Sequence, residues 1–166
     1  INGGNNGSVV TFESGEDSTT VISGFTITNG YANEEPEAGG GIYCNSANPI
    51  LNNLIISDNS AFSGDGIYIS NSNTALTDII ISENTGGESG GGVYSFSSNL
   101  YLLNVQILNN SSQRGGGMYI DDGTNANLVN VTIRDNSSSG MGGESGGGIF
   151  SRNSILSLEY VSIINN

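Results

Sequence analysis

Acidic side chains recur at one position of this sequence, and their recurrence suggests a cation site. Asp58, Glu83 and Asp135 each stand directly before an asparagine. If these positions stack on one another, neighbouring carboxylates repel by about 1 kcal/mol per pair even in water. A hard cation that takes oxygen ligands, such as calcium, would remove that repulsion. The sequence therefore predicts a calcium site on these three carboxylates, with side chains that splay separately into solvent as the alternative.

Groups for catalysis are scarce. The chain has three arginines, no histidine and a formal net charge of −13. Glycoside hydrolysis needs a pair of facing carboxylates, whereas Asp121 and Asp122 are adjacent, and adjacent strand residues face opposite ways. We therefore interpret this pair as a solvated turn and expect no catalytic residue, no cofactor-binding residue and no cofactor, with calcium as the open question.

The charge and hydropathy also bear on partners. A strongly negative chain is repelled by a phosphate backbone, which argues against nucleic acid as a partner. No stretch approaches the ~18 consecutive apolar residues that a membrane span needs. We expect neither nucleic-acid binding nor membrane insertion.

Asparagine and aromatic residues each recur with the same rhythm. Identical amides stacked at strand spacing hydrogen-bond along the stack, so we predict a structural asparagine ladder rather than a ligand site. The predicted ladder consists of Asn59, Asn84, Asn110, Asn136 and Asn166. The aromatic column consists of Tyr43, Tyr68, Tyr94, Tyr119 and Phe150.

A repeated glycine-rich hexamer explains the rhythm. "GGGIYC" at 39–44 returns as "GDGIYI", "GGGVYS", "GGGMYI" and "GGGIFS", and the third residue of the hexamer steps by 25, 26, 25 and 31 positions. A fixed period in this range is typical of repeat proteins that stack one unit on the next. The aliphatic residues between the hexamers align in the same way, for example Leu76, Leu102 and Leu128.

Each repeat has the spacing of three short strands. Successive aliphatic columns are separated by three and then two residues, which indicates two strands joined by a bend, and the segment after the glycines supplies a third strand. The bend carries Asn53, Asp78, Asn104 and Asn130, residue types that tolerate left-handed backbone. We therefore predict an all-β parallel β-helix, a solenoid of single strands with three short strands per coil and coils of about 25 residues.

Alternation along the strand assigns the two faces. The aliphatic residue after the glycines is expected to point into the core, so the aromatic column must point outward. Exposed aromatics flanked by polar groups would favour glycan binding, whereas a structural column would be covered by the loops at 30–38 and 137–145. The exposure of Tyr68 and Tyr94 distinguishes the two.

The glycine hexamer and the Ile-x-x-Asn tetramer together resemble the repeats of chlamydial polymorphic outer-membrane proteins and related bacterial surface proteins. This resemblance implies a right-handed, pectin-lyase-like β-helix and a passenger or stalk segment at a cell surface, and it brings no catalytic residues. We expect residues 1–166 to form one β-helix segment of a longer chain, with a degenerate lead-in coil and loop at 1–38 and five repeats at 39–166.

Two functions follow as expectations. The first is a non-catalytic structural or adhesive segment of a bacterial extracellular or cell-surface protein, whose partners are neighbouring coils or copies of itself that associate end to end into filaments, and glycans or other cell surfaces. The second is a carbohydrate-binding or carbohydrate-active module of the polysaccharide lyase type that uses the aromatic column.

Overall fold

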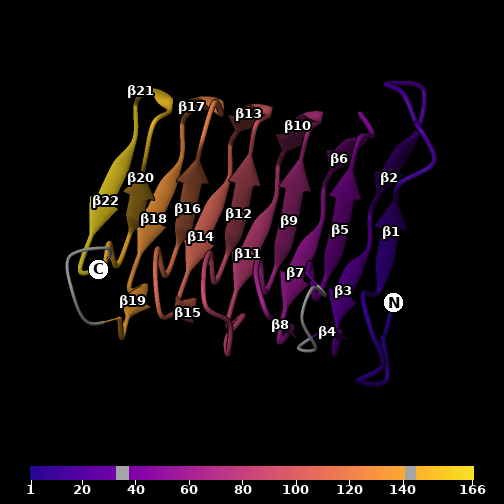
Figure 1. Ribbon diagram of the computed structural model, residues 1–166, viewed down its shortest axis with the longest axis horizontal. Coiled ribbons are helices and arrows are strands. Elements are labelled where there is room, and N and C mark those ends of the chain that lie inside the picture. The colour runs from indigo at the N-terminus through magenta and orange to yellow at the C-terminus, as the bar shows by residue number, and fades with distance from the viewer. Residues whose placement is uncertain (33–37, 141–144) are drawn as a thin grey trace.

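The computed structural model describes residues 1–32, 38–140 and 145–166. The chain winds into a parallel β-helix whose coils lie side by side along the long axis, with the two termini at opposite ends (Figure 1). Each coil adds one strand to each of three six-stranded parallel sheets. The predicted β-helix with three strands per coil is confirmed.

The three sheets are numbered by the order in which a coil passes through them. The first sheet contains β1 (Val10–Phe12), β5 (Ile42–Asn45), β9 (Ile67–Ser70), β12 (Val93–Phe96), β16 (Met118–Asp121) and β20 (Ile149–Ser151). The second contains β2 (Val21–Ser23), β6 (Ile50–Asn52), β10 (Asn73–Thr77), β13 (Asn99–Leu103), β17 (Asn125–Val129) and β21 (Ile155–Glu159). The third contains β3 (Thr26–Thr28), β7 (Ile55–Ser57), β11 (Ile80–Ser82), β14 (Gln106–Leu108), β18 (Thr132–Arg134) and β22 (Ser162–Ile164).

Four two-residue strands follow the third sheet and form two small parallel pairs. They are β4 (Tyr31–Ala32) with β8 (Ser60–Ala61), and β15 (Ser111–Ser112) with β19 (Ser137–Ser138). The sequence pattern did not reveal these strands, because they carry serine, alanine and one tyrosine rather than an aliphatic column.

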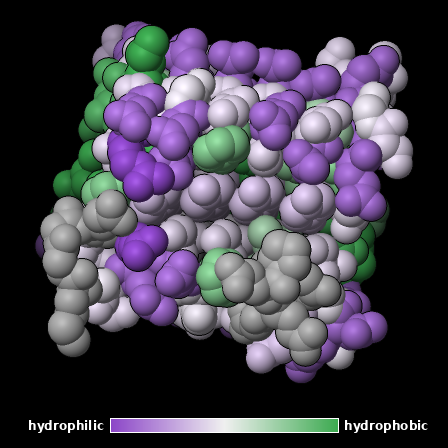
Figure 2. Space-filling model, viewed as in Figure 1, coloured by the Kyte–Doolittle hydropathy of each residue, from purple (hydrophilic) through white to green (hydrophobic). Residues whose placement is uncertain are grey.

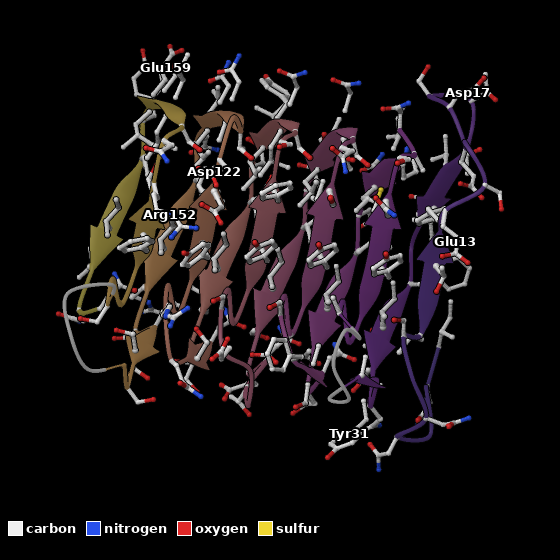
Figure 3. All side chains as sticks on the ribbon, viewed as in Figure 1. Glu13, Asp17, Tyr31, Asp122, Arg152 and Glu159 are labelled. Atoms are coloured by element: carbon white, nitrogen blue, oxygen red, sulfur yellow. The ribbon has the colours of Figure 1, made fainter. Side chains whose placement is uncertain are left out.

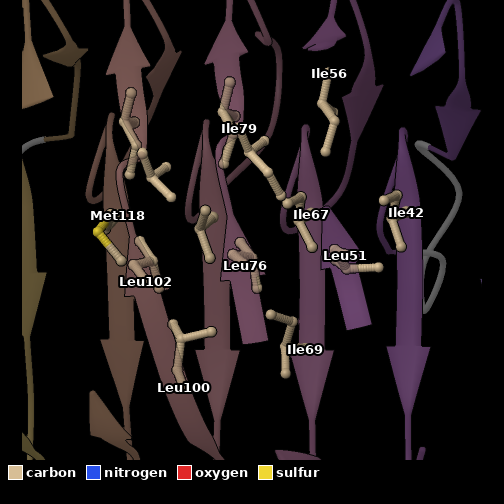
Figure 4. Packing of buried hydrophobic residues seen from close by; sticks show 14 of the residues in the cluster. Ile42, Leu51, Ile56, Ile67, Ile69, Leu76, Ile79, Leu100, Leu102 and Met118 are labelled. Atoms are coloured by element: carbon tan, nitrogen blue, oxygen red, sulfur yellow. The ribbon is translucent and has the colours of Figure 1, made fainter. Parts of the chain in front are cut away.

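The predicted aliphatic columns match the register in which neighbouring strands pair. Leu76 pairs with Leu102 in the second sheet, and Ile81 pairs with Ile107 in the third. All four side chains are fully buried, and Figure 4 shows such residues filling the interior between the sheets. Burying a side chain of this size contributes roughly 1.5–3 kcal/mol, so the stacked columns hold the coils together.

The bends adopt the left-handed conformation predicted for them. Asn53, Asp78, Asn104 and Asn130 have φ between 50° and 56°, where a short polar side chain is tolerated best. The corner before each strand of the first sheet is formed by the glycines of the hexamer, and glycine is required there for a different reason. A Cβ at Gly66 would lie only 2.5 Å from the carbonyl oxygen of Gly92 in the next coil, so close stacking requires glycine here.

The first coil departs from the pattern at one residue. Phe25 stands three residues after Ile22 and two before Ile27, which is the spacing of the inward columns, but it is 47% exposed, whereas Leu54 at the matching position of the next coil is 2% exposed. Residues 1–7 run beside Thr28 and Tyr31 instead of covering Phe25, which leaves its ring open to solvent.

Candidate functional site

The aromatic column lies on the outer face of the first sheet, as predicted, because the aliphatic column occupies the inner face. Its five rings stack continuously, with neighbouring centroids 5.0–5.4 Å apart and planes within 25° of parallel. Such offset stacks add about 0.5–1.5 kcal/mol per pair beyond the area buried. Ring stacking along the column therefore stabilises the contact between adjacent coils on the outer face of the sheet.

The column is not an open aromatic surface. Tyr68 and Tyr94 are half-buried, and Tyr119 is only 2% exposed. Each of these three rings lies between two other rings, so part of both ring faces is covered. Of the loops expected to shield the column, residues 33–37 and 141–144 lie outside the described residues.

An ion pair between the buried Asp121 and the exposed Arg152 lies at the C-terminal end of this face. Arg152 donates from Nε and Nη2 to the two carboxylate oxygens of Asp121, both at 2.9 Å, and the hydroxyl of Tyr94 donates to Oδ2 at 3.4 Å. Burial, together with the charge of Asp121, raises the pKa of Tyr94. The hydrogen bond to Asp121 and its charge raise the pKa of Arg152.

The interpretation of Asp121 as part of a solvated turn was wrong. Asp121 is 4% exposed, whereas Asp122 lies in the turn and accepts a hydrogen bond from Asn153 Nδ2 at 2.7 Å. Figure 3 shows Asp122 and Arg152 on adjacent coils. The signal was present in the sequence, since Asp121 and Arg152 each follow their hexamer directly, and equivalent positions stack.

The acidic column occupies a second left-handed bend. Asp58, Glu83, Asn109 and Asp135 have φ between 54° and 57°, which explains the preference for Asp and Asn. Asn109 Nδ2 donates to Glu83 at 2.9 Å, and Arg134 pairs with Asp135 at 3.2 Å. Within the described ranges, no three Asp, Glu, His or Cys side chains are placed to hold a metal ion. Calcium binding by this column stays a prediction.

The five ladder asparagines form a continuous chain of hydrogen bonds inside the helix. The side-chain Nδ2 of each of the first four donates to Oδ1 of the asparagine in the next coil, at 2.8–3.0 Å. The same nitrogen also donates to a backbone carbonyl, as Asn110 does to Ile81 at 3.0 Å. Asn59, Asn84, Asn110 and Asn136 are at most 2% exposed. The ladder therefore satisfies buried backbone groups along the molecule.

A second row of asparagines, which the predicted columns do not include, lies on the outer face of the second sheet. Asn73, Asn99 and Asn125 are neighbours in the register, and Asn99 Nδ2 donates to Asn73 Oδ1 at 2.6 Å. Beside this row lies a shallow groove that includes Ala75, Tyr101 and Asn127. The sequence does contain a sign of this groove. At the outward position of strands β10, β13 and β17, one coil alone carries an aromatic residue, Tyr101.

Asp65 interrupts the glycine corner. It occupies the position held by Gly40, Gly91 and Gly116 in other coils, and it is fully buried. Its carboxylate accepts the N–H groups of Ala61 at 2.7 Å and Gly87 at 3.1 Å. Burial nevertheless raises the pKa of Asp65 from 3.8 to about 7, and the two hydrogen bonds oppose this shift.

The face in Figure 2 is largely hydrophilic, and strongly hydrophobic residues gather toward its two ends. No helix capable of crossing a membrane occurs in the part of the chain that the structure describes.

Comparison with known proteins identifies the family. The sequence matches the family described as "Right handed beta helix region" over residues 13–166. No curated protein and no solved structure matches the chain. Because the family match spans nearly the whole sequence and agrees with the stacked parallel sheets, the chain belongs to the right-handed β-helix family.

Proposed function

We propose that this β-helix is a non-catalytic structural or adhesive segment of a bacterial extracellular or cell-surface protein. The observation that carries the proposal is the buried asparagine ladder, which runs from Asn59 to Asn166. Together with the aromatic column outside the sheet, it bonds each coil to the next along the axis. Such longitudinal bonding suits a stiff spacer that holds other parts of a protein apart.

Two further features support a surface location. The formal net charge of −13 keeps an extended rod soluble through self-repulsion. The Gly-Gly-Gly-Ile-Tyr and Ile-x-x-Asn repeats also resemble those of chlamydial polymorphic outer-membrane proteins.

In the isolated segment, the exposed apolar side chains of the last coil, such as Leu158 and Ile163, favour end-to-end association of copies.

The second candidate is a polysaccharide lyase or glycoside hydrolase, and the geometry gives it less support. An elimination reaction needs a free base and a free cation at the reacting carbon. Arg152 and Asp121 hold each other in a two-point ion pair, with Tyr94 as a third partner. Separating this pair would leave a carboxylate uncompensated in a site that is 4% exposed.

The direct test is an activity screen of the intact chain. Polygalacturonate, alginate and xylan are incubated with the protein, with and without calcium, and unsaturated products and new reducing ends are measured. We expect no product above the buffer control. Product formation that disappears in Asp121→Asn or Arg152→Gln would overturn the non-catalytic assignment and place the reaction at this ion pair.

A further inference from the structure

The groove on the outer face of the second sheet contains an aromatic ring in an unusual setting. Tyr101 stands on β13, with Ala75 of β10 on one side and Asn127 of β17 on the other. All three point outward, because the residues that flank them along each strand, such as Leu100 and Leu102, are buried. The groove lies beside Tyr101, over Ala75 and the asparagine row.

The ring of Tyr101 has the free surface that the aromatic column lacks. It is 39% exposed, and its two neighbours across the sheet are a methyl group and an amide rather than other rings. The groove is lined on both sides of the ring, by Ala75 on one side and Asn127 on the other, and because alanine is the smaller neighbour, the side that faces Ala75 leaves more room for a ligand. An apolar face of a ligand placed there would contact the ring and the Ala75 methyl group together.

The groove also offers hydrogen-bonding groups in regular order. Asn73 and Asn99 are engaged along the row, and Asn99 gives one of its amide hydrogens to Asn73. Asn125 and Asn127 continue the lining at the C-terminal side and are exposed. A carboxamide presents a donor and an acceptor side by side, which matches two adjacent hydroxyl groups of a sugar.

The charge of the site limits the kind of ligand. The lining residues are Asn, Thr, Ala, Leu and Tyr, with no charged side chain among them. The chain as a whole carries a formal charge of −13, so an acidic polysaccharide would be repelled. A ligand with apolar faces, hydroxyl edges and no charge fits best.

We propose that this groove, centred on Tyr101, binds a neutral glycan. The proposal rests on the adhesive part of the proposed function and names its ligand class. The ring face of one sugar unit lies against Tyr101 and Ala75, and the hydroxyl groups of a neighbouring unit, beyond the tyrosine ring, exchange hydrogen bonds with Asn125 and Asn127. Binding is weak per site, because the groove is shallow and encloses little of the ligand.

The test uses the intact chain and defined oligosaccharides. Cellohexaose, mannohexaose and maltohexaose are the neutral probes, and a galacturonic acid hexamer is the acidic counterpart. Affinity is measured by calorimetry, and the side-chain amide signals of asparagine are followed by NMR. Tyr101→Ala is compared with Tyr160→Ala, because Tyr160 is 81% exposed on a bend outside the groove.

We expect at least one neutral hexamer to bind saturably and to shift the Asn125 and Asn127 amide signals, while the acidic hexamer binds at least about tenfold more weakly. Tyr101→Ala should weaken binding by about tenfold or more, and Tyr160→Ala should leave it unchanged. The site is refuted if no neutral hexamer binds, if the acidic hexamer binds equally well, or if Tyr101→Ala has no effect. If a folded chain binds none of the probes and also degrades no polysaccharide, the glycan site is refuted, but the proposed non-catalytic structural role is not.

Discussion

Replacing Asp65 by asparagine should remove a pH dependence from the stability of the fold. The side chain lies fully buried at a corner where other coils carry glycine, and its hydrogen-bond partners are backbone N–H groups of Ala61 and Gly87. Burial raises the pKa of Asp65 from its ordinary value of 3.8 to about 7. In the unfolded chain the carboxyl group titrates near its ordinary value.

The sign of the effect follows from these two values. Below about pH 4 the carboxyl group is protonated in both states, so its full contribution to stability is present. As the pH rises, the unfolded chain loses the proton first, and the free energy of unfolding falls until the folded state also ionises near pH 7. The difference between 3.8 and about 7 corresponds to about 4 kcal/mol.

The assay is urea unfolding followed by circular dichroism, from about pH 4 to about pH 8.5. The wild-type chain should lose about 4 kcal/mol relative to Asp65→Asn across this range. Asp65→Asn carries a constant cost of about 1–3 kcal/mol because its NH2 group faces a backbone donor, and this cost does not vary with pH. Asp58→Asn, which removes an exposed carboxylate, controls for the loss of one charge. If the difference in free energy of unfolding between the wild-type chain and Asp65→Asn does not change with pH, the two N–H donors offset the effect of burial and the reasoning is refuted.

Three further predictions concern the ladder, the two faces of the sheets and the end of the coil stack. Asn110→Ala leaves its ladder partners unpaired in a buried site and should cost about 3 kcal/mol or more, whereas Asn127→Ala, at an exposed strand position, should cost less than about 1 kcal/mol; equal costs in urea titrations would argue against the ladder. Ile107 has no exposed surface, so Ile107→Asp should lower the free energy of unfolding by more than about 4 kcal/mol. Tyr94→Ser, on the outer face, should lower it by about 2 kcal/mol. Thermal melts that reverse this order would contradict the assignment of the inner and outer faces. Ile163→Lys should suppress end-to-end association of the isolated chain, measured by light scattering, and a wild-type chain that stays monomeric at high concentration would exclude that association.

The coil architecture was predictable because its physical causes act at every repeat. Inward aliphatic columns, a left-handed bend at Asn104 and its equivalents, and a glycine corner are each demanded by stacking at strand spacing. The same repetition made the asparagine ladder predictable, since identical amides in register have one obvious way to bond.

The candidate sites were harder to predict because they depend on single departures from the repeat. Tyr101 is an aromatic residue in a column whose other members are not aromatic, so no recurring pattern in the sequence marks it. The ion pair of Asp121 with Arg152 joins unlike residues at equivalent positions, so a search for identical columns passes over it. The degree of burial of Tyr119 depends on packing around the sheet, which alternation alone does not specify.

The axial ladder can be tested most directly by hydrogen exchange of asparagine side-chain amides, followed by NMR. Asn84, Asn110 and Asn136 are at most 1% exposed and are bonded to the coils on both sides. Their Nδ2 hydrogens should therefore exchange only when coils separate, more than about a thousandfold more slowly than those of the exposed Asn73 and Asn99. Similar exchange rates for the two sets would contradict a rod held together by a continuous ladder along its axis.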